Sequence, residues 1–223
     1  MSYKYELHCH TGKVSMCGKV EPKRIVELYK QNGYSGIVLT DHYSELTFYN
    51  RHLFNPQKEM DFYLSAYREL KEYCKDDEDF TVLLGVELRR YAHTADFLIY
   101  GIDEDFLLNC GNMMAWSDKT LYNKVHEAGG LVFMAHPFRW YIRDRDENVI
   151  DGIEVFNGKN SPERNRKAYE WAQKSGKLMS SGSDFHKECD VAKGGIETNT
   201  KIRTNEDLLN VLKSRDFKLI EKY

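Results

Sequence analysis

Cysteine is scarce in this sequence, and the few cysteines present are poorly spaced for their usual structural roles. The 223 residues contain five, with no CxxC pair among them: Cys9, Cys17, Cys74, Cys110 and Cys189. An odd, scattered set argues against a disulfide framework and against a zinc site built from thiolates. We therefore expect a reducing compartment and a cytoplasmic protein.

Long apolar runs and an excess of positive charge are also missing. No stretch approaches the ~18 apolar residues of a membrane helix, and the N-terminal MSYKYELHCH lacks the apolar segment of a signal peptide. The 32 basic residues are balanced by 35 acidic ones, for a net charge of -3. We therefore expect no membrane partner, and the charge gives no indication of nucleic acid, although a local basic patch would permit it.

The apolar residues that are present fall into short runs separated by helical patterns. Seven runs predict strands at residues 3–9, 36–40, 81–87, 95–101, 131–135, 152–156 and 177–181. Helices are predicted at residues 22–32, 60–74, 119–128, 162–175 and 205–214. This α/β alternation favours parallel strands with crossover helices, in a barrel or a doubly wound sheet that forms one domain over residues 1–223. The long polar and aromatic loop at 43–57 is a candidate functional loop.

Metal-capable side chains occur where these strands end. His8 and His10 lie one residue apart at the end of the first strand, so both face the same side. Later strands end in, or are followed by, the residues Asp41, His42, Glu87, His136, Asp184 and His186. Each motif alone is ordinary for a turn or a helix cap. The joint pattern favours a single site, because the carboxyl ends of such strands share one edge.

The chemistry of this set indicates a metal centre. Imidazole and carboxylate groups suit zinc, manganese or iron. The set holds more donors than one ion needs, so we expect two or three divalent ions sharing a bridging carboxylate, an arrangement that suits phosphoester hydrolysis. Two other histidines lie apart: His126 falls within a predicted helix, at the surface or in packing, and His52 in the long loop is either neutral or a substrate contact.

Five segments in order along the chain carry a family resemblance. LHCHT, GIVLTDH, GVEL, GGLVFMAHP and GSDFH, from residue 5 to about residue 196, resemble the polymerase and histidinol phosphatase (PHP) superfamily. The resemblance implies a distorted seven-stranded (β/α) barrel and a trinuclear metal site. One ion would take His8, His10, Glu87 and Asp184. Glu87 would bridge to a second ion that also takes His136, and a third ion would take His42 and His186.

The resemblance also implies roles beyond ligation. Glu87, Asp184 and His186 are the expected catalytic residues among the ligands. Asp41 precedes a ligand, and we expect it to orient an imidazole through its other nitrogen.

The sequence departs from the family pattern at two places. Relatives often carry an acidic or histidine ligand soon after HxH, where this chain has Cys17; it is either a thiolate ligand of the third ion or a simple loop cysteine. Relatives also often present a histidine before the fourth strand, as a ligand of the second ion. Here Asp96 aligns best without a gap, and His93 is the alternative.

The predicted activity is metal-dependent hydrolysis of a phosphate ester, by a phosphatase of the histidinol phosphatase kind or a small phosphodiesterase. A metal-bound hydroxide would attack phosphorus. The partner would be a phosphorylated small molecule or a nucleotide. Arg139, Arg89 and Lys13 follow ligand-bearing strand ends and are candidate phosphate-binding residues, with Arg139 favoured.

Two alternatives stay open. An amidohydrolase-like enzyme would cleave C–N or C–O bonds, although the GSDFH segment disfavours it. A catalytically degenerate metal-binding domain would serve interactions only, and the missing acidic residue near Cys17 keeps this possible. The loop aromatics, which are Tyr43, Phe48, Tyr49 and Phe54, either stack on a substrate ring or pack against the barrel, and packing is favoured.

Overall fold

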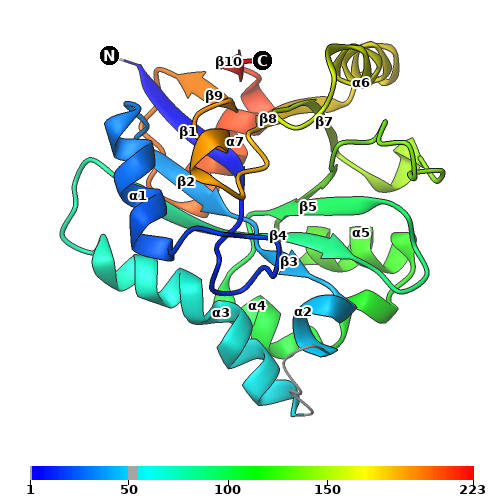
Figure 1. Ribbon diagram of the computed structural model, residues 1–223. Coiled ribbons are helices and arrows are strands. Elements are labelled where there is room, and N and C mark those ends of the chain that lie inside the picture. Colours follow the sequence, from blue (N-terminus) through cyan, green and yellow to red (C-terminus); the bar gives the residue numbers. More distant parts are fainter. Residues whose placement is uncertain (1, 50–54) are drawn as a thin grey trace.

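One curved sheet forms the centre of the protein (Figure 1). The computed structural model describes residues 2–49 and 55–223, so His52 and Phe54 lie outside the described residues. The strands in this part are β1 (Tyr3–Cys9), β2 (Gly36–Leu39), β3 (His42–Tyr43), β4 (Thr81–Arg89), β5 (Asp96–Tyr100), β6 (Leu131–Met134), β7 (Gly152–Asn157), β8 (Leu178–Gly182), β9 (Gly194–Thr198) and β10 (Lys218–Glu221). Their order is β10-β9-β1-β2-β4-β5-β6-β7-β8, and β3 pairs with β4.

The sheet curls into a nearly closed barrel, because the segment that follows β8 returns to β1. Phe185 forms a parallel bridge with Cys9. Its backbone N–H donates to the carbonyl of His8 at 3.1 Å, and its carbonyl accepts from the His10 N–H at 3.0 Å. These bonds bring the SDFH segment directly against the HxH segment.

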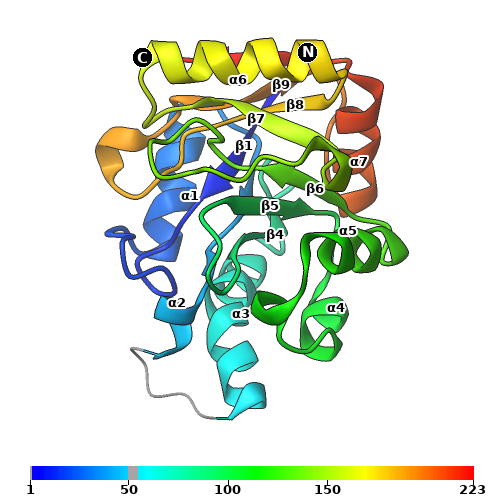
Figure 2. The ribbon, with the colours of Figure 1, turned by 90° about the vertical axis from the view of Figure 1, so that its right-hand side faces the viewer.

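Helices cover the outside of the barrel and one of its ends. They are α1 (Pro22–Gln31), α2 (Glu45–Tyr49), α3 (Pro56–Tyr73), α4 (Glu104–Asn109), α5 (Asp118–Glu127), α6 (Pro162–Ser175) and α7 (Asn205–Ser214), with short 3-10 turns η1 (Met113–Ala115), η2 (Glu147–Val149) and η3 (Glu188–Asp190). Three of the four prolines occupy a first helical turn, where their missing N–H costs nothing. Figure 2 shows α6 running along the outer side of β7 and β8. No helix in residues 2–49 and 55–223 has the length and apolar character needed to cross a membrane.

Two apolar clusters reflect the alternation of side chains along the strands. The interior cluster contains Val38, Leu83, Leu98, Tyr100 and Phe133 from the strands, and Leu208, Leu209, Val211 and Leu212 from α7. The outer cluster takes the intervening strand residues and packs them under α1, α3 and α5. Helix α7 therefore closes the end of the barrel at which β1 begins, and leaves the opposite rim for polar side chains.

The seven predicted strands are all present, within two residues of their predicted bounds. The prediction that they run parallel is wrong for β5, which pairs antiparallel with both β4 and β6. The cause is the short connection at 90–95, since a parallel return needs a crossover of a dozen or more residues. Strands β3, β9 and β10 were not predicted, and β9 also runs antiparallel to β1.

The predicted loop at 43–57 is partly helical, because α2 and the start of α3 lie within it. Tyr43 and Phe48 are buried, with ring centroids 4.9 Å apart, and Tyr43 also contacts Tyr63 of α3 at 5.3 Å. The favoured expectation of packing is confirmed for these two aromatics. Tyr49 is exposed.

Glycine at 152 is required by the packing of the barrel interior. A Cβ at this position would lie 2.1 Å from a ring carbon of Phe133, which is fully buried. We predict that Gly152→Ala lowers the free energy of unfolding by about 1–3 kcal/mol through overpacking. Urea unfolding measures the loss. Phe133→Leu should relieve the overlap, so the double variant should lose less unfolding free energy than the two single variants lose in sum. Strictly additive losses would contradict the steric explanation.

Candidate metal centre

A β-bulge in β1 turns the two histidines of the HxH motif into the barrel. Glu6 pairs with Ile37 and Cys9 pairs with Leu39, so three steps along β1 match two along β2. Tyr5 and Leu7 therefore face the interior below the bulge, and His8 and His10 face it above the bulge. Without the extra residue, the alternation of a regular strand would direct both imidazoles to the outer face.

Glu6 holds this bulge from the outer face. Its Oε1 accepts the backbone N–H groups of Leu7 at 3.0 Å, His8 at 2.9 Å and Ser183 at 2.9 Å, and its Oε2 accepts the Tyr29 hydroxyl at 2.7 Å. Burial raises the pKa of this carboxyl to about 7, although hydrogen bonds from Ser183, His8 and Tyr29 oppose the shift. Glu6 thus joins the two segments that carry His8 and Asp184.

Glu87 lies at the centre of the site. The two-residue strand β3 pairs His42 directly with Glu87, so the His42 Nδ1 lies 2.7 Å from Glu87 Oε2. The same oxygen is 3.3 Å from His10 Nε2. Glu87 Oε1 is 2.9 Å from His136 Nε2 and 3.4 Å from His8 Nε2. One carboxylate therefore faces four imidazoles.

The antiparallel direction of β5 explains how Asp96, at the start of a strand, reaches the same rim. Asp96 lies opposite Arg89 of β4 and forms a two-pronged ion pair with its guanidinium. Its Oδ2 is 3.7 Å from His136 Nε2. His93, the alternative ligand, is 3.6 Å from Asp118 instead. The structure therefore places Asp96, rather than His93, beside the other candidate ligands.

Two residues of the site have strained backbones. His136 has φ +30° and Asp184 has φ +51°, in a backbone region that residues other than glycine rarely adopt. Asp184 Oδ1 lies 3.2 Å from His186 Nδ1, 3.4 Å from His10 Nε2 and 3.6 Å from His8 Nε2. The strain aims both side chains inward, as is common at functional sites.

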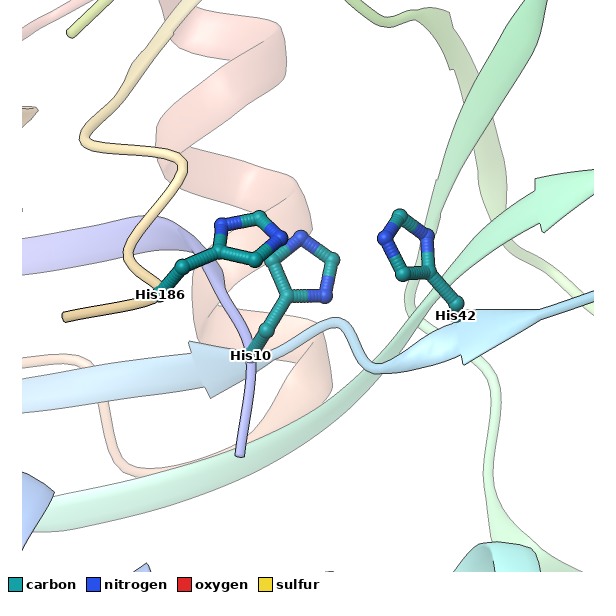
Figure 3. A group of neighbouring side chains, drawn as sticks. All are labelled: His10, His42 and His186. Carbon is teal, nitrogen blue, oxygen red and sulfur yellow. The ribbon is translucent and has the colours of Figure 1, made fainter. Parts of the chain in front are cut away.

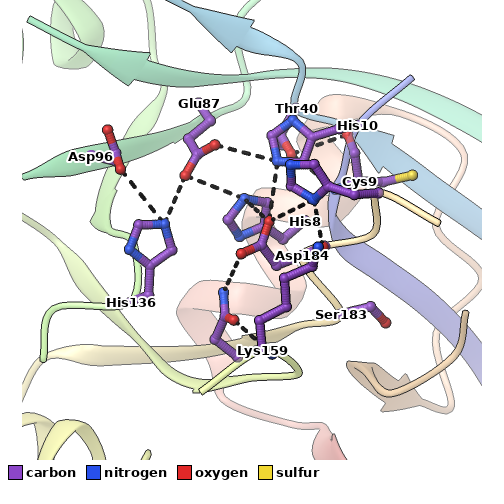
Figure 4. Close-up of polar contacts among 12 residues, drawn as sticks. His8, Cys9, His10, Thr40, Glu87, Asp96, His136, Lys159, Ser183 and Asp184 are labelled. Carbon is purple, nitrogen blue, oxygen red and sulfur yellow. Dashed lines mark hydrogen bonds and ion pairs between the residues drawn. The ribbon is translucent and has the colours of Figure 1, made fainter. Parts of the chain in front are cut away.

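The donors form three overlapping groups, in each of which the ligand atoms lie within 4.8 Å of one another. The groups are His8, Glu87 and His136; His8, His10 and Asp184; and His10, His42 and His186. Figure 3 shows the third group, and Figure 4 shows Glu87 and Asp184 among the imidazoles. His8 Nε2 and His10 Nε2 are buried without a hydrogen-bond partner. Unpartnered imidazole nitrogens that converge with carboxylates fit divalent metal ions of the zinc, manganese and iron class.

Opposite charges hold these groups in mixed protonation states. Burial opposes ionisation of Glu87, but His42 and His8 keep the pKa of this carboxyl well below its usual range. Burial likewise opposes the ionisation of Asp184, whose pKa is held well below its usual range by His8 and His10. Burial, with His42 and His186 nearby, lowers the pKa of His10 well below its ordinary value. Burial is outweighed at His8 by Glu154 and at His42 by Glu87, which hold the pKa of both imidazoles well above the ordinary value. These directions favour charged carboxylates and a neutral His10, and a bound metal ion would have to displace protons from His8 and His42.

Cys17 lies at the open side of the third group. Its Sγ is 3.0 Å from His186 Nε2. Burial disfavours the thiolate, but hydrogen bonds with His186 and His42 lower the pKa of Cys17 to about 6. Burial also disfavours a charged His186, but its contacts with Asp184 and Cys17 raise the pKa of His186 to about 9. The thiol thus faces the candidate ligands, as required if it is a ligand rather than a simple loop cysteine.

The sequence-based prediction missed Glu154 of β7, which supports the site from below. Its Oε1 accepts from His8 Nδ1 at 2.7 Å, and its Oε2 accepts the His136 N–H at 2.8 Å and Asn157 Nδ2 at 3.0 Å. This contact directs His8 Nε2 toward Glu87 and Asp184, and with a metal ion bound it would keep the His8 proton on Nδ1. The sequence feature that could have identified Glu154 is its position as a carboxylate in the middle of the apolar segment GIEVF.

Four other predicted residues differ in how they relate to the site. Asp41 reaches His10 through Ser15, whose hydroxyl donates to Asp41 Oδ1 at 2.7 Å and lies 3.3 Å from His10 Nδ1. Arg139 contacts Asp184 Oδ2 and so lies at the edge of the cluster. Arg89 lies beside Asp96.

Lys13 is directed elsewhere, because its Nζ donates to Glu69 of α3 at 2.7 Å. His126 lies on α5, as expected, and pairs with Asp151 at 2.9 Å.

Comparisons with known proteins agree with this architecture. Residues 6–149 match the family model described as PHP domain, and residues 162–217 match the one described as PHP-associated. No curated protein matches the chain.

Several solved structures have a similar fold. One is a two-domain protein of Bacteroides vulgatus that contains a predicted PHP-like metal-dependent phosphoesterase. It aligns with 100% of this chain, with TM-score 0.70 and 20% sequence identity, and this chain spans 65% of that protein's length. PsfC from Pseudomonas syringae aligns with TM-score 0.69 and 16% identity, over 99% of this chain and 92% of PsfC. An amidohydrolase from Chromobacterium violaceum, with bound sulfate and no metal, aligns with TM-score 0.56 and 17% identity, over 96% of this chain and 97% of that one. At 16–20% sequence identity, these similarities show a shared fold and no more.

We predict that Glu154→Gln weakens metal binding about 10- to 100-fold, because an amide cannot accept from His8 and from the His136 backbone as a carboxylate does. Calorimetric titration with Mn²⁺ or Zn²⁺ measures the affinity. Glu147→Gln, which alters an exposed glutamate bonded to Trp171, is the matched control. Equal affinity in the two variants would show that Glu154 has no part in orienting His8.

Proposed function

Because this chain belongs to the PHP domain family, we propose that it is an enzyme that hydrolyses phosphate esters with the help of divalent metal ions. The observation that carries the proposal is the convergence of Glu87, Asp184 and the imidazoles at one rim of the barrel, with buried nitrogens left unpartnered. Two or three ions are proposed, of zinc, manganese or iron.

The ligand assignment starts from the three donor groups and adds Asp96 and Cys17, which lie beside His136 and His186. His8, His10 and Asp184 would hold one ion, and Glu87 with His136 and Asp96 would hold its neighbour. His42, His186 and Cys17 would hold a third. Bound divalent ions supply an activated water and positive charge that offsets the charge of the phosphoryl oxygens. The chain's own contribution is to fix the donors, through Glu6, Glu154 and Ser15, before substrate arrives.

Two arginines are placed to bind the phosphoryl group. Arg139 and Arg89 line the same pocket as His42 and Cys17. Each guanidinium is held by a carboxylate of the site, since Arg139 contacts Asp184 and Arg89 contacts Asp96. A guanidinium can bind phosphate with two parallel hydrogen bonds, so these side chains would grip the anion beside the ions.

A second candidate function is hydrolysis of a C–N or C–O bond, which is favoured by the similarity in fold to the amidohydrolase. Lactones and amides assayed beside phosphate esters distinguish the two. A cytoplasmic location is part of the proposal, because all five cysteines are unpaired thiols.

The first prediction from this function is chelator-sensitive hydrolysis of a phosphate ester by the protein loaded with manganese or zinc. A generic monoester and a generic diester are compared, and Asp184→Asn should lose metal binding and at least about 99% of activity together, as expected when a ligand is removed. Asp216→Asn, an exposed aspartate beyond the end of α7, is the control. Full activity of Asp184→Asn with unchanged metal content would refute the ligand assignment.

The second prediction concerns substrate binding. Arg139→Ala should raise KM about 10- to 100-fold and leave the metal content unchanged, because the guanidinium contacts the anion rather than the ions. Arg139→Lys should recover only part of the loss, since an amine cannot form the two-pronged contact. Arg166→Ala, on the exposed face of α6, is the control. Loss of metal from Arg139→Ala with an unchanged KM would instead assign the residue a structural role.

A further inference from the structure

Exposed apolar side chains gather beside the metal centre. Met16, Leu46 and Tyr91 line one pocket with the site residues Cys17, His42, Asp96 and Arg139. They are 51%, 65% and 45% exposed. A single exposed apolar residue needs no explanation, but several around one polar pocket are typical of a ligand site.

Separate connections at the same rim supply this apolar wall. Met16 lies in the turn after β1, Leu46 lies on α2, Tyr91 lies between β4 and β5, and Tyr141 lies in the connection after β6. The connections after β1 and β6 also carry His10 and His136, but none of these four apolar side chains is itself a candidate ligand. Their convergence therefore calls for an explanation other than metal ligation.

The two tyrosines of the wall are fixed in position. The Tyr91 N–H donates to the Met114 carbonyl at 3.0 Å, and the Tyr91 hydroxyl accepts from Asn112 at 3.3 Å. The Arg89 guanidinium lies 5.4 Å from the centroid of the Tyr141 ring and 3.5 Å from its hydroxyl. Preorganised rings bind a ligand at a lower entropic cost than mobile side chains do.

The pocket is of a size suited to a small molecule. Its volume is about 440 Å³, near the lower end of the range for small-ligand sites. Its polar lining is the less exposed part, because Asp96 is buried and His42, Arg89 and Arg139 are partly buried, whereas Met16, Leu46, Tyr91 and Glu45 are exposed. The charge is thus suited to an anionic head at the metals, and the exposed carboxylate of Glu45 disfavours a second anionic group at the mouth.

From this division we propose that the pocket binds the alcohol portion of the substrate, and that the substrate is a small phosphate ester whose alcohol is apolar, uncharged and contains a ring. The inference rests on the proposed phosphoesterase function. The phosphoryl group would lie at the metals and arginines, and the ring would lie against Tyr91, Leu46 and Met16. Polynucleotides fit less well, since each further nucleotide would add an anion beyond the two arginines.

Binding of non-hydrolysable phosphonates tests the inference without dependence on leaving-group reactivity. Calorimetry on the metal-loaded protein compares methylphosphonate with benzylphosphonate, which share the head group and differ in the ring. We expect benzylphosphonate to bind about tenfold more tightly, as burial of part of a ring would give. In Tyr91→Ala and in Leu46→Ala this advantage should fall to about twofold or less, with methylphosphonate affinity unchanged.

The control is Tyr169→Ala, which removes a similarly exposed tyrosine from the outer helix α6 and should keep the full advantage. Equal binding of both phosphonates, with phosphate esters still hydrolysed, would overturn the inference and leave the proposed function standing. A ring advantage that survives in both variants would overturn the assignment to this pocket. Failure to bind either phosphonate and to hydrolyse any phosphate ester would overturn both proposals.

Discussion

Buried carboxylates on both faces of the barrel sheet must each be met by donors, and the rest of the structure depends on how this is done. Glu6, Glu87, Glu154 and Asp184 are all at most 2% exposed. An unpaired buried carboxylate costs several kcal/mol even after the structure relaxes. Glu6 is met mainly by backbone N–H groups, and Glu87 and Asp184 are met by imidazoles. The same pairing that makes the charges tolerable assembles the candidate metal ligands.

Backbone irregularity is the structural cost of that assembly. Strand β1 has a bulge between Glu6 and Cys9, and β7 has a second between Glu154 and Phe156. His136 and Asp184 adopt positive φ angles, each of which costs on the order of 1–3 kcal/mol in a residue other than glycine. The two bulges and these two residues lie where polar side chains converge, whereas the strands at the α7 end of the barrel enclose an apolar interior. The two ends thus divide stability and function between them.

The sequence allowed the prediction of the barrel and of most of its polar rim, because both depend on local patterns. Apolar runs marked β1, β2 and β4 to β8, and histidines or carboxylates at their ends marked the rim. The PHP resemblance expected from those motifs is confirmed by the match over residues 6–149. His8 and His10 were expected to share a face, and they do.

The missed features depend on contacts between distant segments. The direction of β5 depends on the short connection at 90–95, which a strand pattern alone does not reveal. Glu6 has the sequence context of an ordinary strand residue, and Glu154 stands out only as a carboxylate in an apolar strand. Only the approach of β7 and β8 to β1 shows what each carboxylate contacts. Lys13 follows HxH in sequence, yet its amine pairs with Glu69 on α3. Position along the chain predicted which candidate ligands gather at the rim and predicted side-chain direction poorly.

The reversed strand β5 also connects the metal centre to the pocket beside it. Because β5 returns antiparallel after a short turn, that turn stays at the rim and presents Tyr91 to the pocket, while Asp96 and Arg89 pair across the two strands. A crossover helix at this point would have taken the chain to the far end of the barrel. The ligands that need fixed geometry therefore lie on or next to strands, and the apolar contacts lie on connections. Such connections tolerate substitution better than barrel strands do, so in the proposed enzyme the pocket is where substitutions would alter substrate preference without changing the candidate metal ligands.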